Sequence, residues 1–290
     1  ESLGGRRLMI VSWYHKTESR PTKGARISIV DMDQSPPQYR HVLLAEPYRQ
    51  GGGVNYRSAE YENDDSDALH AGGIVWYGPY LYVADTNVGM RVFDLTRMLR
   101  ADVTNSSTIG VSGGQTHAAG YQYIVPQIAV YGRSKTVGQN SFASCHVKFS
   151  AIGLDRTTTP HTILSSEYYT PDRTGRLVTW TLDADTHRLD ARDGLVGGPL
   201  VVRGQSAAVS GENRMQGALR ANGVTYISSS SQWGSKGRLY RNRVNDGESS
   251  RTAYPYGVED LYFERDRNLI WTATEHPGQR ELVGIPIPGR

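Results

Sequence analysis

HAGGIVWYGPYLYVADTNVGMRVFDL, residues 70–95, is the stretch that decides the fold. It contains a short apolar segment, a Gly-Pro turn, and two further segments rich in aromatic and β-branched residues. Such segments, bounded by turn residues, are typical of β-strands. Four other stretches of the chain repeat the pattern, and internal repetition of a strand–turn–strand unit is typical of radial or stacked β-architectures.

Each of the five copies is identified by two consecutive strands joined by a turn that holds Gly or Pro. The predicted pairs are 8–14 with 26–31, 81–85 with 91–95, 162–168 with 176–182, 225–230 with 238–244, and 269–274 with 281–287. Preceding strands are predicted at 72–76, 145–153, 217–220 and 260–264, and outer strands at 39–45, 123–131, 199–203 and 250–254. The sequence therefore predicts an all-β fold, a five-bladed β-propeller with four-stranded antiparallel blades, in which residues 1–290 form a single domain.

The composition narrows the class of protein. The 290 residues include 32 basic and 29 acidic residues, and this balance argues against a nucleic-acid partner. No apolar run approaches the roughly 18 residues of a membrane span, so no membrane partner is expected. One cysteine, Cys145, excludes an intrachain disulfide. The chain starts at Glu1 without Met and is rich in Tyr, Ser, Thr and Asn, which favours a processed, secreted and monomeric protein.

Three phrases carry a resemblance to known proteins: residues 72–95, 214–231 (RMQGALRANGVTYISSSS) and 257–278 (GVEDLYFERDRNLIWTATEHPG). They resemble secreted actinobacterial and fungal β-propeller proteins of unassigned function and, more distantly, the lactonase-like and quinoprotein-like propellers. Calcium-binding lactonase-like propellers place carboxylates and Asn around their channel, whereas the matching positions here hold His70, Gln216 and Glu259. The resemblance implies no catalytic set. No cofactor is predicted, and a calcium ion is the one that the resemblance leaves open.

Propeller geometry predicts where a site would lie. The start of each first strand and the end of each second strand lie at one face, so polar residues there converge around a funnel. The predicted catalytic residues are Glu259, Glu275, Glu167 and His70. The predicted substrate-binding residues are Gln216, His146, Tyr14, His15, Tyr168, Trp233 and Asp85, with His276 just beyond Glu275.

Structural roles compete with several of these assignments. Asp85, in the segment VADTN, is typical of an aspartate that caps a turn through its own backbone. Glu259, after a Gly-Val turn, is placed to accept backbone N–H groups at the start of a strand. The sequence contains no zinc signature, P-loop or EF-hand loop.

Two carboxyl groups in different environments serve as acid and base in many hydrolases, and a nearby His exchanges protons near neutral pH. The leading hypothesis is therefore a secreted enzyme, of glycoside hydrolase or polysaccharide lyase type. It would act on a carbohydrate or other small polar, polyhydroxy substrate by general acid/base hydrolysis or elimination. The alternatives are a non-catalytic lectin-like or protein-binding propeller, and a metal-dependent lactonase-like hydrolase.

Overall fold

The structure is a computed structural model that describes residues 2–15, 23–59, 69–132, 147–170, 173–190, 202, 204–231, 235–243 and 249–287. The described chain consists of β-strands, turns and two 3-10 helices, η1 (Leu95–Arg97) and η2 (Arg265–Arg267). The all-β prediction is confirmed. Within the described ranges, no helix has the length and apolar character needed to cross a membrane.

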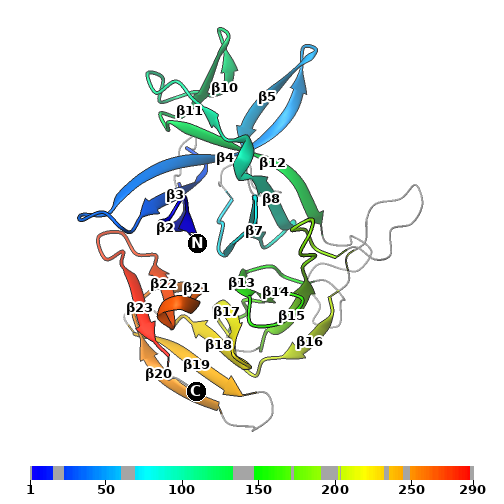
Figure 1. The fold of residues 1–290 in the computed structure, drawn as a ribbon, viewed down its shortest axis with the longest axis vertical. Coiled ribbons are helices and arrows are strands. Elements are labelled where there is room, and N and C mark those ends of the chain that lie inside the picture. Colours follow the sequence, from blue (N-terminus) through cyan, green and yellow to red (C-terminus); the bar gives the residue numbers. More distant parts are fainter. Residues whose placement is uncertain are drawn as a thin grey trace. The chain divides into compact units, whose positions relative to one another are not determined.

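The chain divides into two compact units, which are described one at a time. Unit 1 comprises Glu1–Ala71 and Trp76–Tyr131, and unit 2 comprises Gly72–Val75 and Gly132–Arg290. Unit 2 holds three antiparallel sheets, each built from strands consecutive in the chain (Figure 1). The copy-three sheet is β13 (Ala151–Asp155), β14 (Thr162–Ser166), β15 (Arg176–Thr181) and β16 (Ser206–Val209). The copy-four sheet is β17 (Met215–Ala221), β18 (Val224–Ser229), β19 (Gly237–Arg243) and β20 (Ser249–Tyr254). The copy-five sheet is β21 (Val258–Glu264), β22 (Leu269–Thr274) and β23 (Leu282–Pro286).

The outer strand of the copy-three sheet differs from the prediction. The strand that pairs with β15 is β16, with Ser206 opposite Thr179. The predicted stretch 199–203 lies outside the described residues except for Val202. The sequence pattern favoured Leu200–Val202 because these residues are large and apolar, whereas β16 is the weak segment Ser-Ala-Ala-Val, and all four of its residues are exposed.

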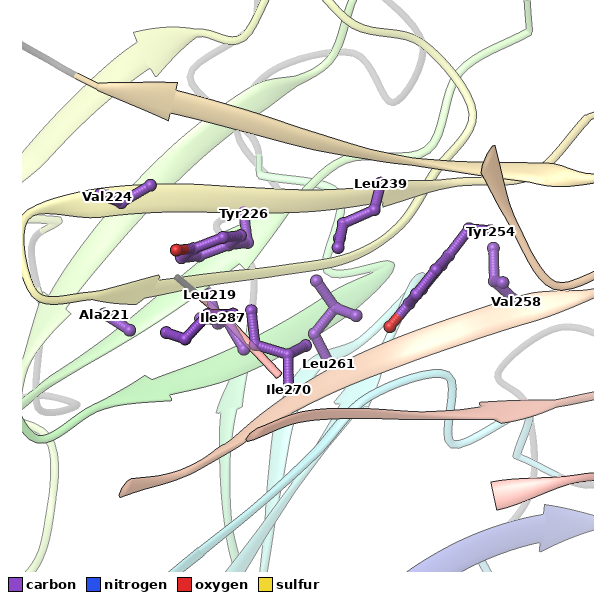
Figure 2. Close-up of a cluster of buried hydrophobic side chains, with 10 residues drawn as sticks. All are labelled: Leu219, Ala221, Val224, Tyr226, Leu239, Tyr254, Val258, Leu261, Ile270 and Ile287. Carbon is purple, nitrogen blue, oxygen red and sulfur yellow. The ribbon is translucent and has the colours of Figure 1, made fainter. Parts of the chain in front are cut away.

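The sheets of unit 2 pack face to face through apolar side chains. Between the copy-four and copy-five sheets lies a cluster of ten buried residues (Figure 2): Leu219, Ala221, Val224, Tyr226, Leu239, Tyr254, Val258, Leu261, Ile270 and Ile287. A second cluster joins the copy-three and copy-four sheets: Leu164, Met215, Ala218, Ile227 and Tyr240. Each sheet therefore buries its apolar face against the sheet of the next repeat, as a sheet with one apolar face must do to be stable.

The first strands of the repeats in unit 2 lie in direct backbone contact, which requires glycine. A Cβ atom added to any of three glycines would clash with the backbone of the next repeat. It would lie 2.4 Å from the Ile152 nitrogen at Gly73 and 2.2 Å from the Ala218 oxygen at Gly153. At Gly217, it would lie 2.8 Å from the Asp260 Cα. The Asp260 carboxylate also accepts a hydrogen bond from the Ile74 amide at 2.9 Å. These contacts gather the starts of four successive repeats at one place in unit 2.

Unit 1 holds a ten-stranded sheet that joins copies one and two. Its strand order is β1 (Ser2–Leu3), β2 (Arg6–Tyr14), β3 (Ala25–Asp31), β4 (Gln38–Gln50), β12 (Tyr123–Gly132), β8 (Gly89–Asp94), β7 (Tyr80–Asp85) and β6 (Ile74–Tyr77). Strand β5 (Gly53–Ser58) pairs with β4, and β9 (Leu99–Arg100) pairs with β12. Strands β10 (Ile109–Ser112) and β11 (Gln115–Ala118) form a separate hairpin.

The parallel pairing of β4 with β12 links the strands of copies one and two in one sheet, a connection that the sequence pattern does not predict. Tyr123 lies opposite Val42, and Pro126 lies opposite Ala45. The paired segment of β4, from Val42 to Ala45, has no exposed surface. An apolar outer strand with unpaired backbone N–H and C=O groups is an aggregation hazard. Here the two outer strands pair with each other through these groups.

Candidate functional site at the start of the copy-five sheet

Two of the predicted site residues meet at irregularities in the first strands of unit 2. The pairing register of β21 shifts at Glu259 and Asp260, and that of β17 shifts at Gln216. A β-bulge turns a side chain away from the regular alternation of its strand and is common near active sites. The Gln216 amide donates to the Glu259 carboxyl at 3.3 Å. A register shift in each of two neighbouring repeats thus accompanies the contact between these two polar side chains.

The electrostatics of this cluster favour neutral carboxyl groups. Burial raises the pKa of Glu259 well above its ordinary value, and the charges of Glu275 and Asp260 raise it further. Burial also raises the pKa of Asp260, although hydrogen bonds from the Ile74 and Leu261 amides act in the opposite direction. Protein atoms surround the Glu259 carboxyl, yet the residue keeps partial contact with solvent. Glu259 is therefore suited to hold a proton that it can donate.

These shifts predict a pH dependence of stability. A carboxyl whose pKa is raised in the folded protein binds its proton there after the unfolded chain has lost it, so the free energy of unfolding falls as pH rises from the ordinary carboxyl pKa toward the raised value. Glu259→Gln keeps the acceptor for Gln216 and removes one titration. We expect its free energy of unfolding to exceed that of the parent at pH 7 and to depend less on pH. Urea titrations at pH 4, 5.5 and 7 measure this, and parallel curves for the two proteins would contradict it.

Glu275 and His276 lie at the end of β22, beside the start of β21. The Glu275 amide donates to the Gly257 carbonyl at 2.9 Å. The Glu275 side chain is 44% exposed, and its carboxylate lies 3.9 Å from the His276 Nε2. His276 stacks on Tyr256, with the ring centroids 4.2 Å apart. The copy-five sheet therefore places the exposed Glu275 carboxylate where its charge acts on the enclosed Glu259 carboxyl group.

Glu167, a predicted catalytic residue, lies in a buried ion pair with Arg176. Its side chain has no exposed surface. Both carboxylate oxygens bond the Arg176 guanidinium, at 2.6 and 2.7 Å, and they also accept the backbone amides of Lys148 and Arg176. A carboxylate with four donors and no contact with solvent is inaccessible to a substrate, so the proposed site leaves Glu167 out.

Asp85, a predicted substrate-binding residue, caps a turn and pairs with an arginine. It is 1% exposed. One oxygen caps the turn by accepting the amides of Asn87 and Val88, and the other accepts the Arg91 Nε at 2.7 Å. Arg91 also donates to Gln127 in β12. Asp85 therefore fastens the turn and the neighbouring strands of unit 1.

The remaining predicted residues lie in four different settings. Tyr14 and His70 are brought together within unit 1, where their rings stack with centroids 4.7 Å apart. His15 accepts the Lys23 amide, and burial, followed by the charges of Lys23 and Arg26, lowers its pKa. Tyr168 is held by its amide, which donates to the Ser150 hydroxyl in the copy-three sheet. His146 and Trp233 lie outside the described residues. Because His70 belongs to unit 1 and the glutamates belong to unit 2, their convergence stays a prediction.

One sequence pattern distinguishes carboxylates that form ion pairs within a repeat from those that do not. In four repeats, the second strand of the predicted pair begins at an arginine: Arg26, Arg91, Arg176 and Arg238. In copies two and three, this arginine pairs with the carboxylate at the end of the first strand of the pair. Copy five has Glu281 at this position, so Glu275 has no arginine at the start of the second strand of the pair to sequester it. Asp260, next to Glu259, is the carboxyl group of the cluster that the prediction missed.

No group of three or more His, Cys, Asp or Glu side chains within the described ranges is arranged to hold a metal ion.

Comparison with known proteins adds little. Neither a known protein family nor a curated protein matches the chain. Among solved structures, extracellular domains 1-2 of Drosophila Semaphorin 1b are similar, with 9% identity and a TM-score of 0.32, over 90% of this chain and 71% of that chain. A similarity this distant carries no argument about fold or function.

Proposed function

We propose that the protein is a general acid/base enzyme that acts on a carbohydrate or another polyhydroxy substrate, with Glu259 as the acid and Glu275 as the base. One observation carries the proposal: the charge of Glu275 acts on Glu259 in the same sheet, and Glu259 is enclosed whereas Glu275 is open to solvent. Divergent environments are what separate an acid from a base in paired-carboxyl enzymes. The pair does not include His70, which belongs to unit 1.

Hydrolysis would divide the work between the two groups. Glu259 gives its proton to the glycosidic oxygen as the bond from that oxygen to the anomeric carbon breaks. Glu275 accepts a proton from the water molecule that forms the new bond at that carbon. Gln216 keeps Glu259 oriented through its amide. Elimination would use the same pair, with the base removing a proton from the carbon beside a substrate carboxyl group and the acid protonating the leaving oxygen.

The proposal also covers the architecture, the location and the oligomeric state of the protein. We place the sheets as blades of a five-bladed β-propeller formed by residues 1–290, in a protein that is secreted and monomeric and needs no cofactor. The glycine-mediated contacts between first strands and the face-to-face cores of unit 2 support this architecture. A propeller would bring the polar ends of the repeats to one face.

The activity test uses soluble xylan, chitosan and polygalacturonate, assayed for new reducing ends and for the ultraviolet absorbance of unsaturated products. We expect Glu259→Gln and Glu275→Gln each to lower kcat about 100-fold on whichever polymer is cleaved, as is typical when a general acid or base is removed. Glu281→Gln, a glutamate of the same turn, is the matched control and should keep the parent rate. Parent-like turnover in both test variants would remove the pair from the mechanism.

A protein-binding role is the second candidate, and exposed apolar residues in unit 1 favour it. Val54 and Val111 are 58% and 38% exposed and lie on neighbouring hairpins. Asn55 joins these hairpins, because its side-chain amide accepts the Val111 N–H and donates to the Val111 carbonyl. A partner with an apolar surface would remove both valines from water on binding, which is favourable. Failure to cleave any polymer, together with loss of partner binding in Val54→Lys, would favour this role over catalysis.

A further inference from the structure

We propose that His276 is a positioning residue that holds the Glu275 carboxylate in its working orientation. This inference rests on the proposed function, because it gives Glu275 the role of base. The prediction from sequence noted His276 beyond the end of its strand but did not include it in the site. Three features of the copy-five sheet support the new role: the fixed ring, the rigid turn and the approach to Glu275.

The His276 ring is fixed between an aromatic face and a glycine. It stacks on Tyr256 at 4.2 Å, with an angle of 28° between the ring planes. On Gly257, an added Cβ would lie 2.6 Å from the His276 Cδ2 and 2.9 Å from Nε2. Gly257 also has a φ of +70°, a conformation that favours glycine. Glycine thus meets two requirements, the backbone conformation and the space that the imidazole fills.

The turn that carries His276 is closed by hydrogen bonds on both sides. Its first residue, Glu275, donates its amide to Gly257 and accepts the Arg280 Nε through its carbonyl. The Thr274 hydroxyl donates to the Gln279 carbonyl and accepts the Glu281 amide, at 2.8 Å each. The Gln279 amide donates to the His276 carbonyl. A turn with this many internal bonds fixes where its side chains start.

The fixed ring borders the carboxylate that the mechanism uses. The distance of 3.9 Å between Nε2 and the Glu275 oxygen is within ion-pair range when the imidazole is protonated, and it is longer than a hydrogen bond. Both side chains are partly exposed, at 21% and 44%, so a purely structural pair here would add little stability. A side chain that is clamped yet accessible is better explained by positioning, since small displacements of a catalytic group are costly to rate.

Two variants test the Nε2 atom of His276 and the position of its ring separately. His276→Phe keeps a ring on Tyr256 and removes Nε2, whereas Gly257→Ala keeps the histidine and displaces its ring. We expect both to lower kcat about tenfold on the polymer that the parent cleaves, with KM changed less than about twofold. Tyr256→Phe keeps the stack and should behave as the parent. Melting temperatures check that each variant is folded.

A measurement without substrate tests the geometry itself. The ring protons of His276 should be shifted in the NMR spectrum of the parent by the ring current of Tyr256, and Gly257→Ala should change that shift. Unshifted His276 protons in the parent would overturn the proposal. So would parent-like kcat in His276→Phe when Glu275→Gln has lost activity, and in that case the proposed function would stand. Parent-like turnover in Glu275→Gln would overturn both.

Discussion

Replacing Arg176 with Met is expected to lower the free energy of unfolding by about 3–5 kcal/mol, the usual cost of leaving one partner of a buried ion pair alone. Glu167 has no exposed side-chain surface, and Arg176 is its one charged partner among the contacts described. The two backbone amides that also bond Glu167 do not neutralise its charge. Urea-induced unfolding monitored by circular dichroism measures the loss.

The double variant Glu167→Gln/Arg176→Met is the matched control for this prediction. Gln carries no charge and keeps one oxygen, which can accept one of the two backbone amides that bond the Glu167 carboxylate, so we expect part of the stability to return. Arg97→Ala, which breaks an ion pair whose arginine is 72% exposed, should cost less than about 1 kcal/mol. If Glu167 were instead a catalytic residue, Glu167→Gln alone would abolish turnover without changing stability, which would reverse our structural assignment.

Gly153→Ala is expected to destabilise the protein by about 3 kcal/mol, at the upper end of what overpacking usually costs. The new Cβ would lie 2.2 Å from the Ala218 carbonyl oxygen and 2.9 Å from the Leu219 Cβ. The nearest of these atoms is backbone and cannot move aside by changing a rotamer. Strands β13 and β17 would have to separate, which would disturb the core between the copy-three and copy-four sheets.

Gly53→Ala provides the comparison for Gly153→Ala. It also adds one methyl group to a strand glycine, but its nearest neighbour is the Gln50 carbonyl oxygen at 3.7 Å. We expect its free energy of unfolding to stay within about 0.5 kcal/mol of the parent. Equal stability of the two variants would mean that the first strands of unit 2 do not meet as closely as the structure places them.

The strands were largely predictable because their signals are local. Strand β22 was predicted with both bounds correct, and β3, β7, β8 and β19 were predicted to within about one residue at most ends. Alternating apolar residues and bounding turn residues act over a few positions and need no partner to be recognised. The exceptions had a weak local signal, as in β16, or depended on a distant partner, as in the parallel pairing of β4 with β12.

The candidate site was only partly predictable. The sequence placed Gln216, Glu259 and Glu275 at strand ends, and unit 2 brings them together. It also placed Glu167 and Asp85 at strand ends, but arginines across the hairpin sequester both of them. A carboxylate at a strand end is paired only if a basic side chain lies opposite it on the neighbouring strand. The pairing register of the two strands decides which residue lies opposite, and a residue's position in the chain does not.

The sequence by itself determined that the chain is all-β, built from repeated hairpins, with polar residues at their ends. Those properties follow from side-chain size, polarity and turn preference, which each segment carries alone. Only the tertiary structure decided which carboxyl groups are neutralised, which one is enclosed beside Asp260, and that a glycine makes room for the His276 ring. These outcomes arise from contacts between segments distant in the chain, because burial and pairing are properties of neighbours in space.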